Sequence, residues 1–207
     1  MQTARTEPPF IPVRSGWPTR HVPRWVLGAA AVLLAVAVAV GLSHRPTNGQ
    51  RGADLRGFLQ QLNADIESCS GGVRESLFVL HKIDSGASTD VKTALNVANT
   101  AAANCSPANN TLLVDLTAAQ PPESLASYHL GAAITGLIDW AAPRATRVAA
   151  DVADVLTDRG SPAEAADRTA LRLALRELDA QRNVVYTVLA PAINSLSPES
   201  VAPRLYG

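Results

Sequence analysis

The amino-acid sequence predicts an all-helical protein, in which a single N-terminal transmembrane helix precedes an antiparallel up-down-up-down four-helix bundle. Three observations support this prediction. Residues 25–42 contain no charged side chain, the chain beyond them repeats apolar side chains every three or four positions, and both cysteines lie in phase with that repeat. No segment shows the strict alternation of apolar and polar residues that is typical of a strand.

Residues 25–42 read WVLGAAAVLLAVAVAVGL and are predicted to form a helix that crosses the lipid bilayer. A helix of this length spans about 27 Å, close to the roughly 30 Å thickness of the hydrocarbon core. Residues 1–24 carry five prolines among mostly polar side chains, which predicts a disordered leader. A cleaved secretory signal, and hence a secreted helical protein, is the alternative, because Ala39-Val40-Gly41 matches a small-x-small cleavage site.

Charge predicts which side of the membrane each end occupies. Residues 1–56 hold seven arginines and two acidic residues, whereas 57–207 hold eleven basic and sixteen acidic residues. The more basic end is expected to stay in the cytoplasm. Both cysteines follow the apolar segment, which favours an oxidising, extracytoplasmic compartment for the bundle. Sixteen arginines against two lysines indicate a bacterial genome of high GC content. The expected product is a single-pass cell-membrane protein with an extracytoplasmic C-terminal domain.

The first helix of the bundle follows a polar juxtamembrane linker, which is predicted at residues 43–52. Gly71 and Gly72 interrupt this helix without changing its phase, so we expect one long helix with a bend near its middle. The sequence Ser85-Gly86-Ala87-Ser88 is expected to end it. The apolar face consists of Leu55, Leu59, Leu62, Ile66, Cys69, Val73, Leu77 and Leu80.

The second and third helical segments each contain an internal proline. The second begins near Val91, and Pro107 is expected to bend or restart it, with Ser106 as the N-cap of the new helix. The third covers about 123–158, and Pro143 is expected to kink it because proline lacks a backbone N–H. Both segments therefore keep their phase but are predicted to be irregular.

The fourth helical segment starts at a capping box, Ser161-Pro162-Ala163-Glu164. Pro191 is expected to disrupt its end, which leaves residues 193–207 as a C-terminal tail whose docking the sequence leaves open. Four segments of about thirty residues, joined by short turns over 53–192, fit an up-down-up-down bundle better than other helical arrangements.

The two cysteines test this arrangement. Residues at one level of an antiparallel hairpin are equally distant in sequence from its turn, and Cys69 and Cys105 are symmetric about residue 87. That position lies inside the turn predicted at 85–88, and both cysteines lie on apolar helix faces. We therefore predict a Cys69–Cys105 disulfide, with two buried free thiols as the alternative.

The same register places Gly71, Gly72, Trp140 and Arg182 at the level of the disulfide. Trp140 is the only tryptophan beyond residue 42. Its indole is expected to pack on the disulfide and to fill the space that the glycines leave. The alternative is a small-molecule pocket in this central layer.

The sequence contains no motif for a metal, cofactor or nucleotide. His81 and His129 are the only histidines beyond the linker, and neither lies in a Glu-x-x-His arrangement of the kind found in di-iron bundles. Neither a phosphate-binding glycine loop nor the Gly-x-Ser-x-Gly motif of serine hydrolases is present. We therefore expect no cofactor and no enzymatic activity.

Arg168, Arg172 and Arg176 form a basic stripe at helical spacing. Since the surrounding domain is acidic, we expect either that Arg168 and Arg172 pair with Asp151 and Asp154 across the turn near residue 160 or that the stripe is a solvated face, and not that it binds nucleic acid or anionic lipid. The sequence favours a noncatalytic, membrane-anchored interaction module of the cell envelope that binds the bilayer through 25–42 and an envelope protein partner. A ligand-sensing ectodomain that works with a partner subunit is the alternative.

Overall fold

The computed structural model of the chain describes residues 46–108 and 110–206. The predicted leader and transmembrane helix, together with the start of the predicted linker, lie outside these residues. Within the described ranges no helix is both long enough and apolar enough to cross a membrane. The predicted all-helical class is confirmed for this part of the chain, which contains no strand.

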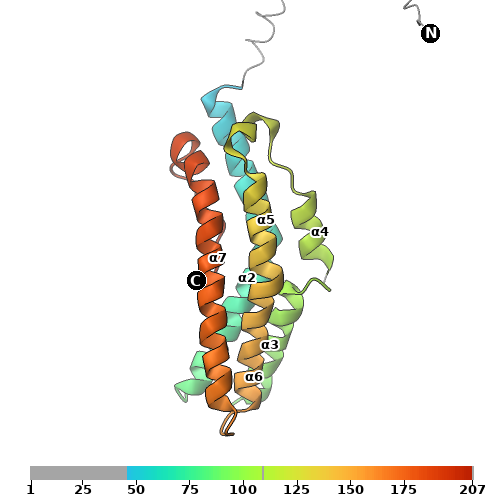
Figure 1. Cartoon of the computed structure of the whole chain (residues 1–207), viewed down its shortest axis with the longest axis vertical. Helices are drawn as coiled ribbons and strands as arrows, with labels where there is room; N and C mark the ends of the chain where they lie inside the picture. Colours follow the sequence, from blue (N-terminus) through green and yellow to red (C-terminus); the bar gives the residue numbers. More distant parts are fainter. Residues whose placement is uncertain (1–45, 109, 207) are drawn as a thin grey trace, which may run out of the picture. The chain divides into compact units, whose positions relative to one another are not determined.

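The described residues form long helices that lie side by side, and successive segments run in alternating directions (Figure 1). Helix α2 packs on α3, α3 on α6, and α7 on both α5 and α6. The elements in chain order are α2 (Asn48–Asp84), α3 (Val91–Cys105), α4 (Asn110–Ala118), the 3₁₀ helix η1 (Glu123–Tyr128), α5 (Gly131–Asp139), the π-helical turn η2 (Trp140–Ala145), α6 (Thr146–Thr157) and α7 (Glu164–Leu196).

Helix α2 is continuous through Gly71 and Gly72, as its phase predicts, but it begins earlier than expected. Thr47 is its N-cap, and the Thr47 hydroxyl accepts a hydrogen bond from the Gln50 N–H at 3.2 Å. Residues 48–52, predicted as part of the linker, are therefore helical. The packing of Gly52 explains the difference: it is buried, and a Cβ at this position would lie only 2.8 Å from the Leu196 carbonyl oxygen.

The prolines act less uniformly than predicted. At Pro107 the chain does break, but the next helix starts only at Asn110, so Ser106 is the C-cap of α3 and not the predicted N-cap of the new helix. Pro143 lies inside the π-helical turn that joins α5 to α6. The irregularity predicted at this proline is therefore present as a wider helical turn, and the chain remains helical from α5 to α6. The predicted disruption at Pro191 is wrong, since α7 continues to Leu196. Burial of Leu189 and Ala192 in the core on either side of this proline favours the continued helix.

Two helix starts also differ from the prediction. The third segment does not begin as one helix at 123, because η1 ends at Tyr128 and the C-cap residue His129 adopts a left-handed conformation with φ of 52°. Helix α7 starts at Glu164 without the predicted Ser161 cap. The Glu164 carboxylate instead accepts a hydrogen bond from the Gly160 N–H at 2.8 Å.

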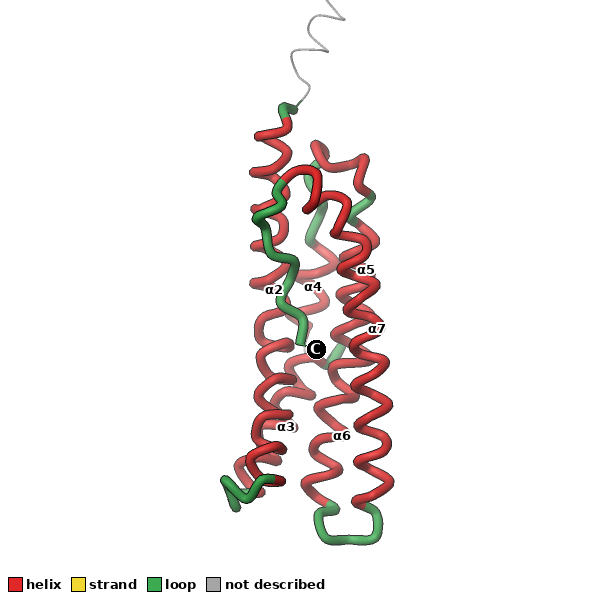
Figure 2. Tube along the Cα trace, turned by 90° about the vertical axis from the view of Figure 1, so that its left-hand side faces the viewer, coloured by secondary structure: helices red, strands yellow, loops and turns green. Residues whose placement is uncertain are grey.

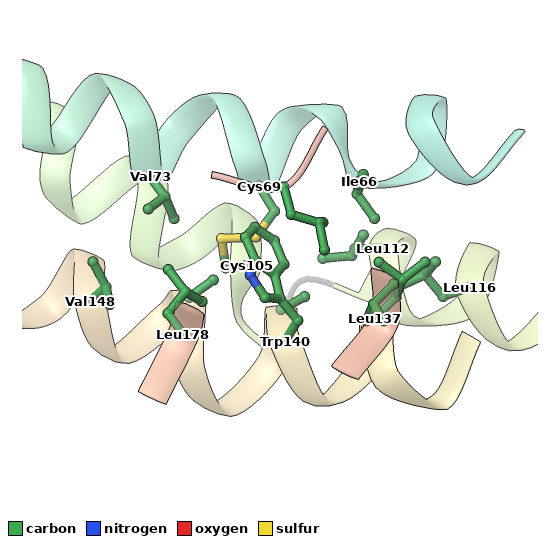
Figure 3. Packing of buried hydrophobic residues seen from close by; sticks show 14 of the residues in the cluster. Ile66, Cys69, Val73, Cys105, Leu112, Leu116, Leu137, Trp140, Val148 and Leu178 are labelled. Carbon is green, nitrogen blue, oxygen red and sulfur yellow. A yellow bond between two sulfur atoms is a disulfide. The ribbon is translucent and has the colours of Figure 1, made fainter. Parts of the chain in front are cut away.

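Apolar side chains from all the long helices meet in one continuous core (Figure 3). Trp140 from η2 is its largest fully buried side chain, and the indole lies beside the disulfide that joins α2 to α3. The remaining largest fully buried side chains are Leu55, Leu62, Ile66, Leu116, Leu125, Leu130, Leu137, Leu156, Leu178, Leu189 and Val73.

The C-terminal tail, residues 197–206, turns back after α7 and runs along α2 (Figure 2). Arg204 binds α2 through both backbone polar groups: its N–H donates to the Asn63 side chain at 2.8 Å, and its carbonyl accepts from Ser70 Oγ at 2.7 Å. The Tyr186 hydroxyl on α7 donates to the Pro203 carbonyl at 3.1 Å. The tail is thus a docked part of the bundle.

Candidate functional site

The predicted disulfide is present and belongs to the core. Cys69 and Cys105 are bonded, with their Cα atoms 4.8 Å apart, and neither side chain is exposed. Because a buried disulfide has no access to other thiols, its role here is structural. The register argument for the hairpin of α2 and α3 is confirmed.

Two residues of the central layer predicted from the sequence, Gly72 and Trp140, are closely packed. A Cβ on Gly72 would lie 3.1 Å from the Ala101 Cβ, so this glycine permits close contact between α2 and α3 and leaves no space for a ligand. Trp140 is fully buried, and its Nε1–H has no hydrogen-bond partner among the described residues. Arg182 pairs along its own helix with Asp179 at 3.6 Å.

Gly71 differs from its neighbour, because a Cβ there would have no atom within 4 Å. This glycine lies on a groove of about 630 Å³ between α2 and the C-terminal tail. The volume is within the range of small-molecule sites in proteins. Of the four residues assigned to the central layer, Gly71 is the one that lines the groove, and the groove is the strongest candidate site.

The α2 wall of the groove carries a polar stripe. Each residue of this stripe comes directly after a residue of the apolar face of α2. The stripe therefore has the same spacing as the apolar face and lies about 100° away from it around the helix axis. The tail contributes the opposite wall through Glu199, Ser200, Val201 and Arg204. The polar stripe consists of Arg56, Gln60, Asn63, Glu67, Ser70 and Arg74.

The floor of the groove is apolar, because Leu59 and Ile66 also line it and are almost fully buried. Val201 on the tail adds a third apolar side chain and is 65% exposed. A ligand in the groove would therefore meet apolar surface below and polar groups along both walls. This combination is typical of sites that bind small organic molecules.

One end of the groove is held by an ion pair. Arg56 Nη1 lies 3.3 Å from the Glu199 carboxylate and donates to the Ser197 hydroxyl at 3.1 Å. Hydrogen bonds from its own backbone N–H and from Ser197, with Arg56 as a smaller contribution, lower the pKa of Glu199. Glu199 is therefore ionised at neutral pH and neutralises Arg56.

The polar side chains that line the groove carry carboxylate, amide, hydroxyl and guanidinium groups. Among its described lining residues there is no histidine or cysteine, and the Ser70 hydroxyl already donates to the tail backbone. In residues 46–108 and 110–206 no group of three His, Cys, Asp or Glu side chains is arranged to hold a metal ion.

The ion-pair partners predicted for the α7 arginine stripe are wrong, whereas the alternative of a solvated face fits Arg172 and Arg176, which are exposed. Arg168 pairs with Asp84 on α2 at 2.7 Å and with Glu164 at 2.8 Å, not with Asp151 or Asp154. Asp151 lies nearest Arg147, at 3.8 Å, and burial raises its pKa. The rotation of α7 about its own axis directs Arg168 toward the C-terminal end of α2. Counting residues from the turn gives the level of a residue along the bundle but not this rotation.

Sequence reasoning missed the groove, although its signal is present in the chain. The polar stripe repeats at steps of four and three, and a solvated helix face would show the same pattern. Only the return of the tail distinguishes a groove wall from such a face. In comparisons with known proteins, no family model matches the chain, and neither a curated protein nor a solved structure matches it.

Proposed function

We propose that this protein is a noncatalytic interaction module of the bacterial cell envelope, anchored by residues 25–42 with its helical bundle outside the cytoplasm. The observation that carries this proposal is the buried Cys69–Cys105 disulfide. Disulfides of this kind persist in oxidising compartments and are rare in the cytosol. An apolar segment of membrane-spanning length lies directly before the bundle in the sequence.

Reporter fusions at the two ends test the compartment. Alkaline phosphatase is active only where its own disulfides form, so a fusion after residue 207 is expected to be active and a fusion before residue 1 inactive. The reverse pattern would contradict the proposed topology. Mass spectrometry of the chain from native membranes distinguishes the anchored protein, which retains residues 1–24, from the cleaved and secreted alternative.

Exposed apolar side chains on α7 are where we expect the partner to bind. Leu173 and Val184 are about half exposed and lie eleven positions apart, which places them on one face of the helix. A photo-crosslinking residue at either position is expected to capture the same envelope protein, and a crosslinker at the exposed Gln61 on α2 is the control. Crosslinks that are equal at all three positions would contradict a specific interface.

A ligand-binding ectodomain that works with a partner subunit is the second candidate. The groove between α2 and the tail favours it, because its volume and its mixed polar and apolar lining suit a small molecule. A thermal shift screen of the purified chain tests this function, since a ligand that binds only the folded state raises the melting temperature.

A further inference from the structure

We propose that the groove between α2 and the C-terminal tail binds a small organic anion, whose phosphate or carboxylate group is held by Arg74 and Arg204. This inference rests on the second candidate function, ligand binding, and does not depend on the topology of the chain. The charges that line the groove, the hydrogen bonds that fix the tail and the volume of the groove support this assignment.

The groove is basic within an acidic domain. Residues 46–207 hold thirteen basic and seventeen acidic side chains, whereas the groove is lined by three arginines and two glutamates. Glu199 neutralises Arg56. Arg74 and Arg204 form no ion pair within the described residues, and Glu67 is the one remaining acid of the lining. A local excess of positive charge therefore remains for a ligand.

The backbone of Arg204 is fixed in place before any ligand arrives. Its backbone N–H and carbonyl are both bonded to α2, through Asn63 and Ser70. The guanidinium is thus carried on anchored backbone, opposite the helix that carries Arg74. Because the ordering of the backbone is complete in the folded protein, less conformational entropy is lost when an anion binds. Arginine is the side chain best suited to phosphate and carboxylate, which it can bind through two parallel hydrogen bonds.

The volume of the groove and its other polar side chains indicate what kind of anion would fit. A groove of about 630 Å³ admits a molecule of metabolite size. Gly71 leaves room beside Arg74, since a Cβ there would touch nothing. Glu67 and Gln60 face the same groove and can accept hydrogen bonds, so we expect the ligand to carry hydroxyl or amino groups as well as its anionic group.

Titration of the full chain in nanodiscs of zwitterionic lipid tests this proposal. The probes are glycerol 3-phosphate, citrate, inorganic phosphate and, as the neutral control, glycerol, with binding followed by calorimetry and melting temperature. At least one organic anion is expected to bind and raise the melting temperature, more weakly at high salt because the interaction is ionic. In a final experiment, the zwitterionic lipid of the nanodisc is replaced with an anionic lipid. Weaker binding of the soluble probe in the anionic nanodisc would show that a lipid headgroup competes for the same arginines.

Variants show whether binding occurs in the groove. Arg74→Gln and Arg204→Gln are each expected to weaken binding at least tenfold, as for loss of a charged hydrogen bond. Arg176→Gln, an exposed arginine of α7 outside the groove, should leave affinity unchanged. If Arg204→Gln loosens the tail, Arg74→Gln alone decides the question. The proposal is overturned if no probe binds the wild type, or if Arg74→Gln binds as tightly as Arg176→Gln. Neither result would bear on the envelope interaction proposed above.

Discussion

Two adjacent glycines in α2 meet different surroundings, and this makes them a matched pair. Both occupy the interior of a helix, where replacement by alanine stabilises the fold by about 0.5–1 kcal/mol if the site is open. Gly71→Ala is therefore expected to raise the free energy of unfolding, because its new Cβ meets no atom within 4 Å.

Gly72→Ala is expected to be less stable than Gly71→Ala by about 1 kcal/mol or more, since its Cβ would press on the Ala101 backbone and Cβ at 3.1–3.2 Å. Urea denaturation of both variants measures the difference. If the two variants were equally stable, α2 and α3 would be able to move apart at Gly72 at little energetic cost, and the close contact would not restrict this position.

Trp140 is the side chain on which core packing depends most. Trp140→Ala is expected to cost about 3–5 kcal/mol, because it leaves a large cavity beside the disulfide. Trp140→Phe should cost much less, since it retains most of the packing and removes a buried N–H that has no partner among the described residues. Chemical denaturation followed by circular dichroism compares the two. A phenylalanine variant as unstable as the alanine variant would contradict this account.

Among the helices and connections, the tail is the element whose stability is most open to direct test. The double variant Asn63→Ala, Ser70→Ala removes both hydrogen bonds to the Arg204 backbone. We expect faster hydrogen exchange of residues 198–206 and a loss of roughly 1 kcal/mol for each bond. Gln61→Ala, an exposed neighbour on α2, is the control. Unchanged exchange in the double variant would show that Tyr186 and the buried Leu205 hold the tail by themselves.

The far end of the bundle is joined by an ion-pair network between α2 and α7. Arg168, by its hydrogen bonds, and then Arg159 lower the pKa of Asp84 below the usual value for aspartate, about 3.9. A depressed folded-state pKa contributes stability that is present above the unfolded pKa and is lost as the pH falls through the folded value.

Asp84→Asn is therefore expected to destabilise the protein at pH 7 by about 1 kcal/mol, a typical value for a partly exposed network. The difference from wild type should shrink below about pH 4. Thermal denaturation between pH 2.5 and 7 measures this effect, with Asp139→Asn at an exposed position on α5 as the control. A penalty that stays constant with pH would contradict the assignment to charge.

The whole molecule is cross-linked by one disulfide among the described residues, and it closes a loop with a sequence separation of 36 residues. In the chain-entropy model, a loop of this length stabilises the folded state by roughly 3–4 kcal/mol. The double variant Cys69→Ala, Cys105→Ala is expected to lose about this amount, because the unfolded chain regains its freedom. Urea midpoints measured without reductant test the value, and a midpoint equal to wild type would contradict it.

Much of the architecture could be predicted because its signals are local or depend on simple counting. Periodicity at steps of three and four marks helix faces wherever it occurs, and the symmetric placement of Cys69 and Cys105 about their turn needs only one hairpin to specify a disulfide. The disulfide was predicted correctly because the level of a residue in an antiparallel hairpin depends only on the number of residues between it and the turn. The break at Pro107 was predicted for a similar reason, since proline lacks the N–H that a helix requires, but the predicted role of Ser106 as the next N-cap was wrong.

The sequence by itself determined the helical class, the main helix faces and the cysteine pairing. The tertiary structure decided the early start of α2 at Asn48, the passage of α7 through Pro191, the choice of Asp84 as partner for Arg168, and the groove that the tail completes. These features depend on the rotation of each helix about its axis and on contacts between residues far apart in the sequence, 84 positions for Arg168 with Asp84 and 141 for Arg204 with Asn63. Local propensity contains no information on such contacts, because their energy appears only when the two surfaces meet.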